Sequence, residues 1–221
     1  MSKELKILAV VSAFVIVAAI IGTILYRRSV QSERRATTVN SALARADSAT
    51  LGPAEAPVTI VEFYDPECES CSAFNPTVKK MLKDYPGQVR LVARYMPLHP
   101  NSLLAASFTE AAGEQGKYWQ MQEMLFQRQP EWGERHGAPT TSQPPDVPAL
   151  FEKYALELGL DVAKINRAVK ENRYAAKLAR DKQDGQSLGV RRTPTIFVNG
   201  RQLARLDAAD LKALIDEELQ R

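Results

Sequence analysis

The chain of 221 residues has only two cysteines, Cys68 and Cys71, which stand three positions apart. No other disulfide pairing is possible within one chain. A Cys-x-x-Cys that stands alone is far more specific than one chosen from a cysteine-rich sequence. Two thiols at this spacing can close a disulfide, so the motif predicts a redox site.

The sequence also lacks internal repeats, a glycine-rich phosphate loop and a large excess of either charge. The net charge of +3 is too small to predict a nucleic-acid partner, and much of the basic excess lies in Arg27, Arg28, Arg34 and Arg35. This basic cluster is expected to meet lipid headgroups. With 45% hydrophobic and 25% charged residues, the composition is that of a globular protein.

Charged residues are absent from 7–25, a run of 19 residues. As a helix this run spans roughly 28 Å, close to the thickness of the hydrocarbon core of a bilayer. The first Ala-x-Ala beyond it is Ala42-Leu43-Ala44, too distant for a cleaved signal peptide. We therefore predict a short tail at 1–6 and an uncleaved transmembrane signal anchor at 7–26. The alternative is a buried core helix.

Charges around this span give an ambiguous orientation. Lys3 and Lys6 precede it and four arginines follow it, which by the positive-inside rule places the rest of the chain in the cytoplasm. Large domains, however, translocate with limited regard to flanking charge, and a membrane-tethered Cys-x-x-Cys domain suits an oxidising compartment. We expect a single-pass inner-membrane protein with its catalytic domain on the periplasmic side.

Beyond the span, the pattern predicts a linker at 27–56 and one α/β domain at 57–221. Apolar runs at 58–64 and 89–95 flank a helical pattern at 72–85, which predicts two parallel strands joined by a right-handed crossover. The region at about 102–188 is mostly helical, with a proline-rich loop. Helices are predicted at 102–114, 118–127, 148–158 and 161–183. The loop is predicted at 130–148.

The β pattern returns after Gly189. A strand is predicted at 195–198, followed by Asn199-Gly200, a strong signal for a two-residue hairpin, and by a final helix capped by Asp207. In the first strand, Glu62 is anomalous because a carboxylate is costly to bury among apolar neighbours.

Three stretches together resemble one known family. They are APVTIVEFYDPECESC, the helical middle, and VRRTPTIFVNG before the last helix. Over about 57–219 the chain is similar to DsbA-like thioredoxin-fold oxidoreductases. The resemblance implies a thioredoxin fold with an inserted helical subdomain, preceded here by the transmembrane helix.

Roles for five residues follow from this resemblance. Cys68 resembles the exposed attacking cysteine and Cys71 the resolving one. Thr193-Pro194 resembles the cis-proline loop that docks an extended substrate. Glu62 matches a buried carboxylate that relays the Cys71 proton, unless it lies at a strand edge and reaches solvent. No organic cofactor is implied, and the partners are client proteins with thiols or disulfides and a membrane or soluble redox partner.

The direction of electron flow stays open between oxidase, reductase and isomerase. Family oxidases commonly carry Pro-His between the cysteines, where this chain has Glu69-Ser70. From the sequence, no imidazolium favours the Cys68 thiolate, and Glu67 and Glu69 oppose it. We therefore predict a reduction potential more reducing than that of the strongest DsbA-type oxidases.

An alternative hypothesis, from a different functional class, is a copper-delivery module, because two thiolates can bind Cu(I). It would use Cys68, Cys71 and His99, although a loop histidine is more often structural or simply exposed. A structural disulfide in an interaction domain is a third reading. The preferred hypothesis, a thiol–disulfide oxidoreductase, includes no metal site.

Overall fold

The computed structural model describes residues 20–23, 26, 42–133 and 145–221. The chain divides into two units, Met1–Ser41 and Ala42–Arg221. In the first unit only 20–23 and 26 are described, and they are helical. The predicted anchor at 7–26 therefore falls almost wholly outside the described residues. Within the described ranges, no helix combines the length and the apolar character needed to cross a bilayer.

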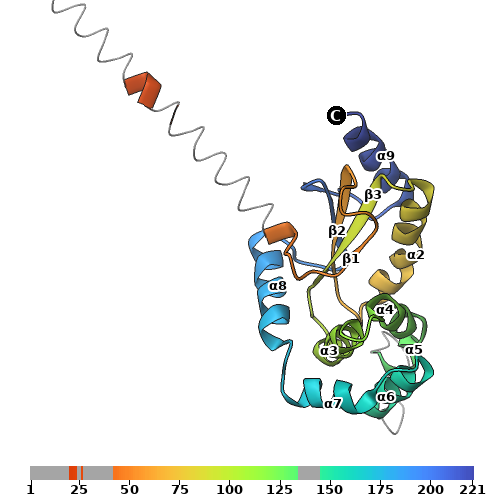
Figure 1. Ribbon diagram of the computed structural model, residues 1–221. Coiled ribbons are helices and arrows are strands. Elements are labelled where there is room, and N and C mark those ends of the chain that lie inside the picture. Colours follow the sequence, from red (N-terminus) through yellow and green to blue (C-terminus); the bar gives the residue numbers. More distant parts are fainter. Residues whose placement is uncertain (1–19, 24–25, 27–41, 134–144) are drawn as a thin grey trace, which may run out of the picture. The chain divides into compact units, whose positions relative to one another are not determined.

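A five-stranded sheet in the order β1-β3-β2-β4-β5 forms the centre of the second unit (Figure 1). Its strands are β1 (Thr50–Leu51), β2 (Val58–Tyr64), β3 (Val89–Tyr95), β4 (Thr195–Val198) and β5 (Arg201–Gln202). β2 and β3 run parallel and the other neighbours are antiparallel. The predicted strands and the parallel pair are confirmed. Because β2 is the central strand, its side chains are covered on both faces of the sheet.

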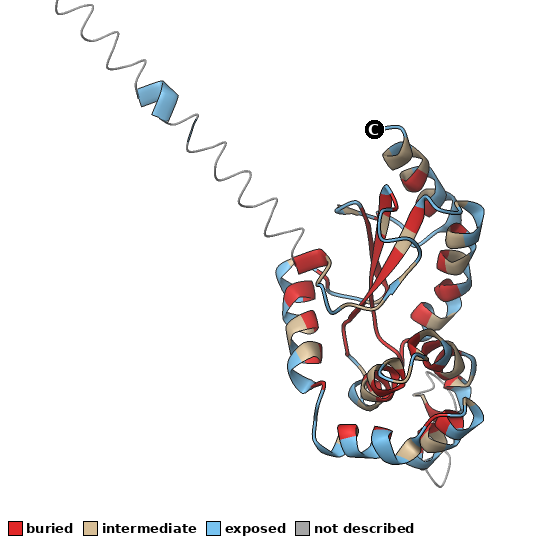
Figure 2. Cartoon of the chain, viewed as in Figure 1, coloured by how far each residue is buried: buried red, intermediate tan, exposed pale blue. Residues whose placement is uncertain are grey.

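Two helices, α2 (Glu69–Asp84) and α9 (Ala208–Leu219), cover one face of the sheet (Figure 1). The core on this side is aliphatic and includes Val58 and Ile60 of β2, Val78 of α2 and Ile215 of α9, all fully buried. Figure 2 shows buried positions along the sheet and on both helices. This layer holds the strand and the helix that carry the cysteine motif.

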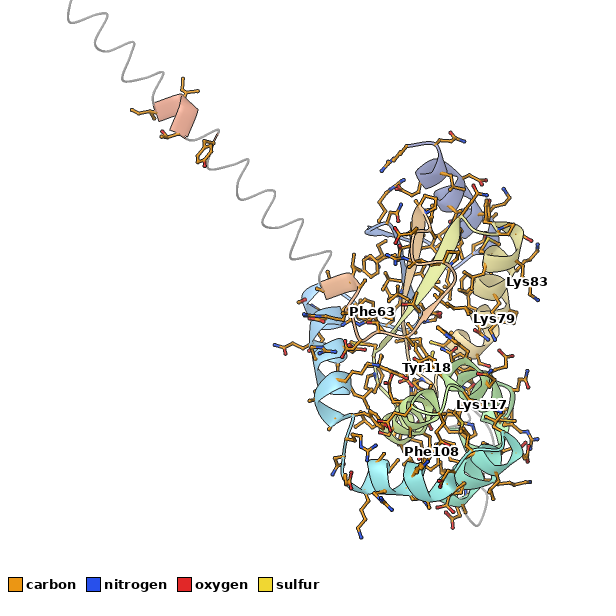
Figure 3. All side chains as sticks on the ribbon, in the orientation of Figure 1. Phe63, Lys79, Lys83, Phe108, Lys117 and Tyr118 are labelled. Carbon is orange, nitrogen blue, oxygen red and sulfur yellow. The ribbon has the colours of Figure 1, made fainter. Side chains whose placement is uncertain are left out.

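The predicted helical insertion is confirmed, and the described residues between β3 and β4 form six helices. They are α3 (Ser102–Gly113), α4 (Tyr118–Gln127), α5 (Gln129–Trp132), α6 (Val147–Glu157), α7 (Val162–Lys170) and α8 (Ala175–Ser187). Their core is rich in aromatic side chains, including Phe108 and Tyr118 (Figure 3). The Phe151 ring lies 5.4 Å from that of Phe108 and 4.9 Å from that of Trp132.

Two details of this region differ from prediction. The single helix predicted at 161–183 is two helices, α7 and α8, because Asn172 adopts a left-handed conformation (φ 51°) between them. The predicted proline-rich loop begins with the short helix α5, which buries Trp132. Residues 134–144 of this loop lie outside the described part of the chain.

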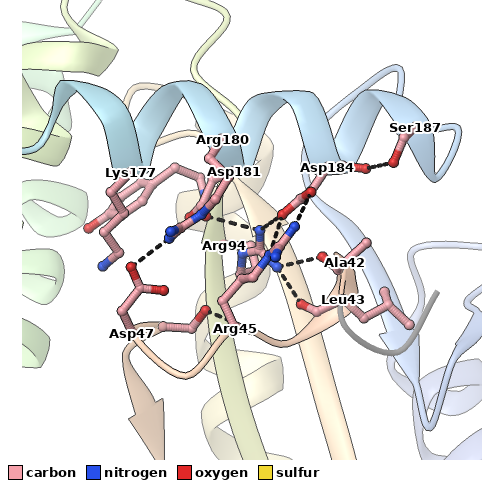
Figure 4. Close-up of polar contacts among 12 residues, drawn as sticks. Ala42, Leu43, Arg45, Asp47, Arg94, Lys177, Arg180, Asp181, Asp184 and Ser187 are labelled. Carbon is pink, nitrogen blue, oxygen red and sulfur yellow. Dashed lines mark hydrogen bonds and ion pairs between the residues drawn. The ribbon is translucent and has the colours of Figure 1, made fainter. Parts of the chain in front are cut away.

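Part of the predicted linker belongs to the folded unit. β1 pairs with β3, and Ala42 and Leu43 are buried, so the compact unit begins fifteen residues before the predicted boundary at 57. The cause is Arg94 of β3, whose buried guanidinium donates to the carbonyls of both residues at 2.5 and 2.8 Å (Figure 4). A buried arginine needs such partners, and this one organises the chain segment beside it.

The same guanidinium pairs with two aspartates of α8. Arg94 lies 3.0 Å from Asp181 and 2.6 Å from Asp184, and Asp184 also binds Arg45 at 2.7 Å (Figure 4). The network therefore connects β3, α8 and the segment before β1.

The predicted hairpin is also confirmed, because Asn199 and Gly200 both have positive φ (46° and 86°), as a type I′ turn requires.

Candidate active site

The cysteine pair lies where β2 passes into α2. Cys68 is the N-cap residue of the helix, and its carbonyl accepts the N–H groups of Cys71 and Ser72 at 3.0 and 3.1 Å. The helix thus begins at Glu69, three residues before its predicted start, and Cys71 lies in its first turn. Both cysteines are free thiols; Cys68 is 8% exposed and Cys71 is fully buried.

The two thiols have opposite pKa shifts. The pKa of Cys68 falls to about 6, mainly because its sulfur accepts a hydrogen bond from the Cys71 thiol. Burial raises this pKa, but hydrogen bonds with Thr193 and with helix amides lower it further. Burial raises the pKa of Cys71 well above its ordinary value, and Cys68 adds to this effect. Near neutral pH Cys68 is therefore a thiolate and Cys71 a protonated thiol, so the pair has one nucleophile.

The acids beside Cys68 do not prevent this. The Glu67 carboxylate is buried and accepts the backbone and side-chain N–H groups of Asn101, at 2.6 and 2.8 Å, where α3 begins. Glu69 is exposed to solvent, which screens its charge. The hydrogen bonds to the Cys68 sulfur therefore stabilise the thiolate more than these two carboxylates destabilise it.

Glu62 lies in the middle of β2, paired with Ala93 on one side and Ile196 on the other. It is 4% exposed, and its Oε1 atom has no hydrogen-bond partner among the described residues. Burial and then the charge of Cys68 raise the pKa of Glu62 to about 7. The alternative of a strand-edge glutamate that reaches solvent is excluded, whereas its role as a proton relay stays a prediction.

The Thr193-Pro194 loop precedes β4 and lies against the attacking thiol. Its peptide bond is cis, and the Cys68 Sγ lies 3.4 Å from the Thr193 carbonyl oxygen. A cavity of about 300 Å³ continues along the loop, lined by Ser70, Thr193 and Pro194 and by Leu206 before α9. The structure thus places the loop beside the cysteines; that it docks substrate stays a prediction.

His99 is named from the sequence only as a candidate copper ligand, and no imidazolium is inferred there to favour the Cys68 thiolate. That inference is wrong, because His99 and Cys68 line the same cavity, of about 320 Å³, and their charges interact. The Nδ1 atom of His99 lies 2.8 Å from the carboxylate of Asp65, which is fully buried. Asp65 directly follows β2 and His99 closely follows β3. Because these strands are parallel, their carboxyl ends meet at one sheet edge, and this signal could have paired the two residues.

No group of three or more His, Cys, Asp and Glu side chains is arranged to hold a metal ion in the described part of the chain. The predicted use of His99 as a third ligand beside the cysteines finds no support in this geometry, since the imidazole is hydrogen-bonded to Asp65.

Comparison with known proteins agrees with this arrangement. A family model described as thioredoxin matches residues 45–217. The chain belongs to the thioredoxin family. Among solved structures it is similar to BdbD from Bacillus subtilis, with 27% identity and a TM-score of 0.67 over 79% of this chain and 94% of that one. A thioredoxin-like oxidoreductase from Silicibacter pomeroyi has 26% identity and a TM-score of 0.67, with 82% and 98% coverage.

Other similarities are more limited. The alpha-DsbA1 structure from Wolbachia pipientis has 20% identity and a TM-score of 0.71, with 83% and 96% coverage, and shows the common fold. A curated relative, the Na(+)/H(+) antiporter NhaA 3 of Salinispora tropica, is 36% identical over 178 residues, which cover 76% of this chain and 25% of the antiporter. The chain thus spans about a quarter of the length of the curated relatives it matches.

The family match and the similar structures confirm the predicted thioredoxin fold with a helical insertion. The two thiols, with opposite pKa shifts, and the similarity to a thioredoxin-like oxidoreductase support the prediction of a protein thiol–disulfide oxidoreductase.

Proposed function

We propose that this thioredoxin-family protein exchanges disulfides with client proteins through Cys68 and Cys71, on the periplasmic side of a membrane. The observation that carries the proposal is the opposite ionisation of two adjacent thiols beside the cis Thr193-Pro194 peptide. A nucleophilic thiolate, a protonated second thiol and a loop beside the thiolate along which a substrate can lie are the parts that disulfide exchange requires.

In the reducing direction, the Cys68 thiolate attacks one sulfur of a client disulfide and the other client sulfur leaves as a thiolate. Cys71 then loses its proton and attacks the Cys68 sulfur. This step breaks the mixed disulfide, releases the second client thiol and leaves a Cys68–Cys71 disulfide. Two electrons pass from the enzyme dithiol to the client. The reverse sequence oxidises a client dithiol.

We assign to Glu62 the removal of the Cys71 proton. Its carboxylate raises the pKa of Cys71 through its charge, which indicates that the two groups interact. A carboxyl group with a pKa of about 7 is half ionised at neutral pH, so it can accept a proton in one half-reaction and return it in the other.

We assign substrate docking to Thr193 and Pro194. The Thr193 carbonyl already lies beside Cys68 Sγ, and the adjoining cavity runs toward Leu206, a half-exposed apolar residue. An extended client segment laid along this loop would present its sulfur to Cys68. Its backbone would hydrogen-bond with the loop as a strand does.

The proposed location rests on the sequence. The uncharged run at 7–25 supports an anchor at 7–26 in the lipid bilayer, with 27–41 connecting it to the folded unit. An oxidising compartment suits a domain whose only cysteines form a redox pair. A C-terminal alkaline phosphatase fusion to the full chain should be active in bacteria, and an inactive fusion would place the domain in the cytoplasm.

Reduction of insulin by dithiothreitol, followed as turbidity, tests the proposed chemistry. The wild-type protein should accelerate it, Cys68→Ser should abolish the acceleration, and Lys164→Gln, at an exposed position of α7, should retain it. Unchanged activity in Cys68→Ser would refute the proposal. Copper binding that depends on both cysteines, without an effect of either on insulin, would favour the copper module.

A further inference from the structure

His99 is fixed in place by a buried carboxylate. One oxygen of Asp65, Oδ2, lies 2.8 Å from His99 Nδ1 and also accepts the backbone N–H groups of Leu98 and His99, at 2.6 and 3.2 Å. The other oxygen accepts the Ser102 hydroxyl and the Glu67 N–H. Asp65 thus holds both the loop and the ring, and Nδ1 donates to it. The second ring nitrogen, Nε2, is left available, and the side chain is 23% exposed.

Cys68 and His99 line one cavity, enclosed by the start of α2, the loop after β3 and the loop before the cis-proline peptide. Its other charged groups are Glu67, Glu69, Arg191 and Arg192. Glu62 and Cys71 also interact with Cys68. Glu67 is hydrogen-bonded to Asn101, whereas Glu69 and both arginines are exposed and their charges are screened by solvent. Of the cations in this group, only His99 is fixed by a buried partner.

The charges of His99 and Cys68 interact. Burial lowers the pKa of His99, but the hydrogen bond and charge of Asp65, and then the charges of Cys68 and Glu67, raise it above 6.5 overall. Coupling between two sites is reciprocal, so a protonated His99 stabilises the Cys68 thiolate by the same free energy. This effect is smaller than those of Cys71, Thr193 and the helix amides, which dominate the pKa of Cys68.

We propose that His99, held by Asp65, is a positioning residue that stabilises the Cys68 thiolate across their shared cavity and makes the enzyme a stronger oxidant. The inference rests on the proposed function, because it takes Cys68 to be the attacking thiol. The imidazolium favours the reduced, thiolate-bearing state over the disulfide, which has no charge at this position. It therefore raises the reduction potential below the pKa of His99 and ceases to do so above it.

An NMR titration of the full chain tests this without altering the site. The chain has two histidines, so a His136→Gln variant assigns the His99 signal. The midpoint of His99 should be higher in the reduced than in the oxidised protein, by on the order of half a pH unit, because the oxidised protein has no thiolate. Equal midpoints in the two redox states would overturn the proposal.

Variants test the effect on the thiol itself. His99→Gln keeps a hydrogen-bond donor for Asp65 but removes the charge, so the midpoint of Cys68 alkylation by iodoacetamide should rise by about half a pH unit. At pH 6, where about half of Cys68 is a thiolate, its equilibrium with glutathione should shift about 1.5-fold, or about 5 mV, toward the disulfide. At pH values well above the His99 midpoint found by NMR it should match wild type. His99→Lys should restore most of the wild-type midpoint. Lys164→Gln on α7, an exposed control with the same change of charge, should have no effect.

The alkylation midpoint of Cys68 could rise equally in His99→Gln and His99→Lys, or the equilibrium of His99→Gln with glutathione could differ from wild type by the same factor at every pH. Either result would show a purely structural role for His99 and overturn the proposal. An unchanged alkylation midpoint in His99→Gln would do the same. These readouts follow the thiol and not a client. Their failure is therefore distinct from failure of the proposed function, which insulin reduction by Cys68→Ser tests separately.

Discussion

Replacement of Glu62 by Gln should stabilise the reduced protein, and only at pH values where Glu62 would be charged. The buried carboxyl has a pKa of about 7 in the folded protein against 4.5 when solvated. At about 1.4 kcal/mol per pKa unit, ionised Glu62 costs about 3 kcal/mol of folding free energy. Below pH 4.5 the group is protonated in both states and costs nothing. The cost grows as the pH rises toward 7 and is constant above it.

Urea unfolding measured between pH 4 and 8 under reducing conditions should show this dependence. The difference in unfolding free energy between Glu62→Gln and wild type should be small at pH 4 and reach about 3 kcal/mol in favour of the variant at pH 8. Fluorescence of Trp119 and Trp132 reports the transition. Glu69→Gln, which removes an exposed carboxylate, is the control and should show no comparable gain. A difference that does not change with pH would refute a raised pKa for Glu62.

Three further predictions concern the thiol, the buried arginine and the potential. Alkylation of Cys68 in the reduced protein should rise with pH around a midpoint of about 6; a midpoint near that of an ordinary thiol, about 8.5, would contradict the hydrogen bonding described here. Arg94→Met should lower the unfolding free energy by about 3–5 kcal/mol, because it removes the ion pair of the buried Asp181 and one of the two arginine partners of Asp184. Arg173→Met, which breaks exposed ion pairs, should cost less than about 1 kcal/mol, and equal losses would contradict this. Equilibration with glutathione should give a potential more negative than about −120 mV, because a Cys68 pKa of about 6 marks a less stabilised thiolate than the pKa of about 3.5 in DsbA, and a value near −120 mV would refute this.

The strands and the cysteine motif could be predicted because their signals are local. The β-branched run that begins at Val58 and the Asn199-Gly200 turn are set by the conformational preferences of the residues themselves. The start of α2 was placed too late, because Glu69 and Ser70 carry no apolar periodicity and Cys68 caps the helix through its backbone alone. The break between α7 and α8 was missed, because it rests on an asparagine rather than a glycine or proline.

Features that depend on distant contacts could not be predicted. In the sequence, Arg94 resembles an ordinary polar residue of a strand. The residues around it in the sequence give no indication of the α8 aspartates or the carbonyl groups that it binds. The contact of His99 with Asp65 is indicated by the parallel pairing of β2 and β3, but the cavity that His99 shares with Cys68 is formed only by the fold. The acids beside Cys68 were correctly noted as charges, but Glu67 is bound to Asn101, a contact that only the fold reveals.

Trapping of a mixed disulfide tests the central claim most directly. Purified Cys71→Ser protein mixed with a peptide that contains one disulfide should form a covalent complex through Cys68, because the second thiol that would release the peptide is missing. Mass spectrometry should find this complex with Cys71→Ser and not with Cys68→Ser. A complex of equal yield with Cys68→Ser, or none with Cys71→Ser, would contradict attack by Cys68 and resolution by Cys71.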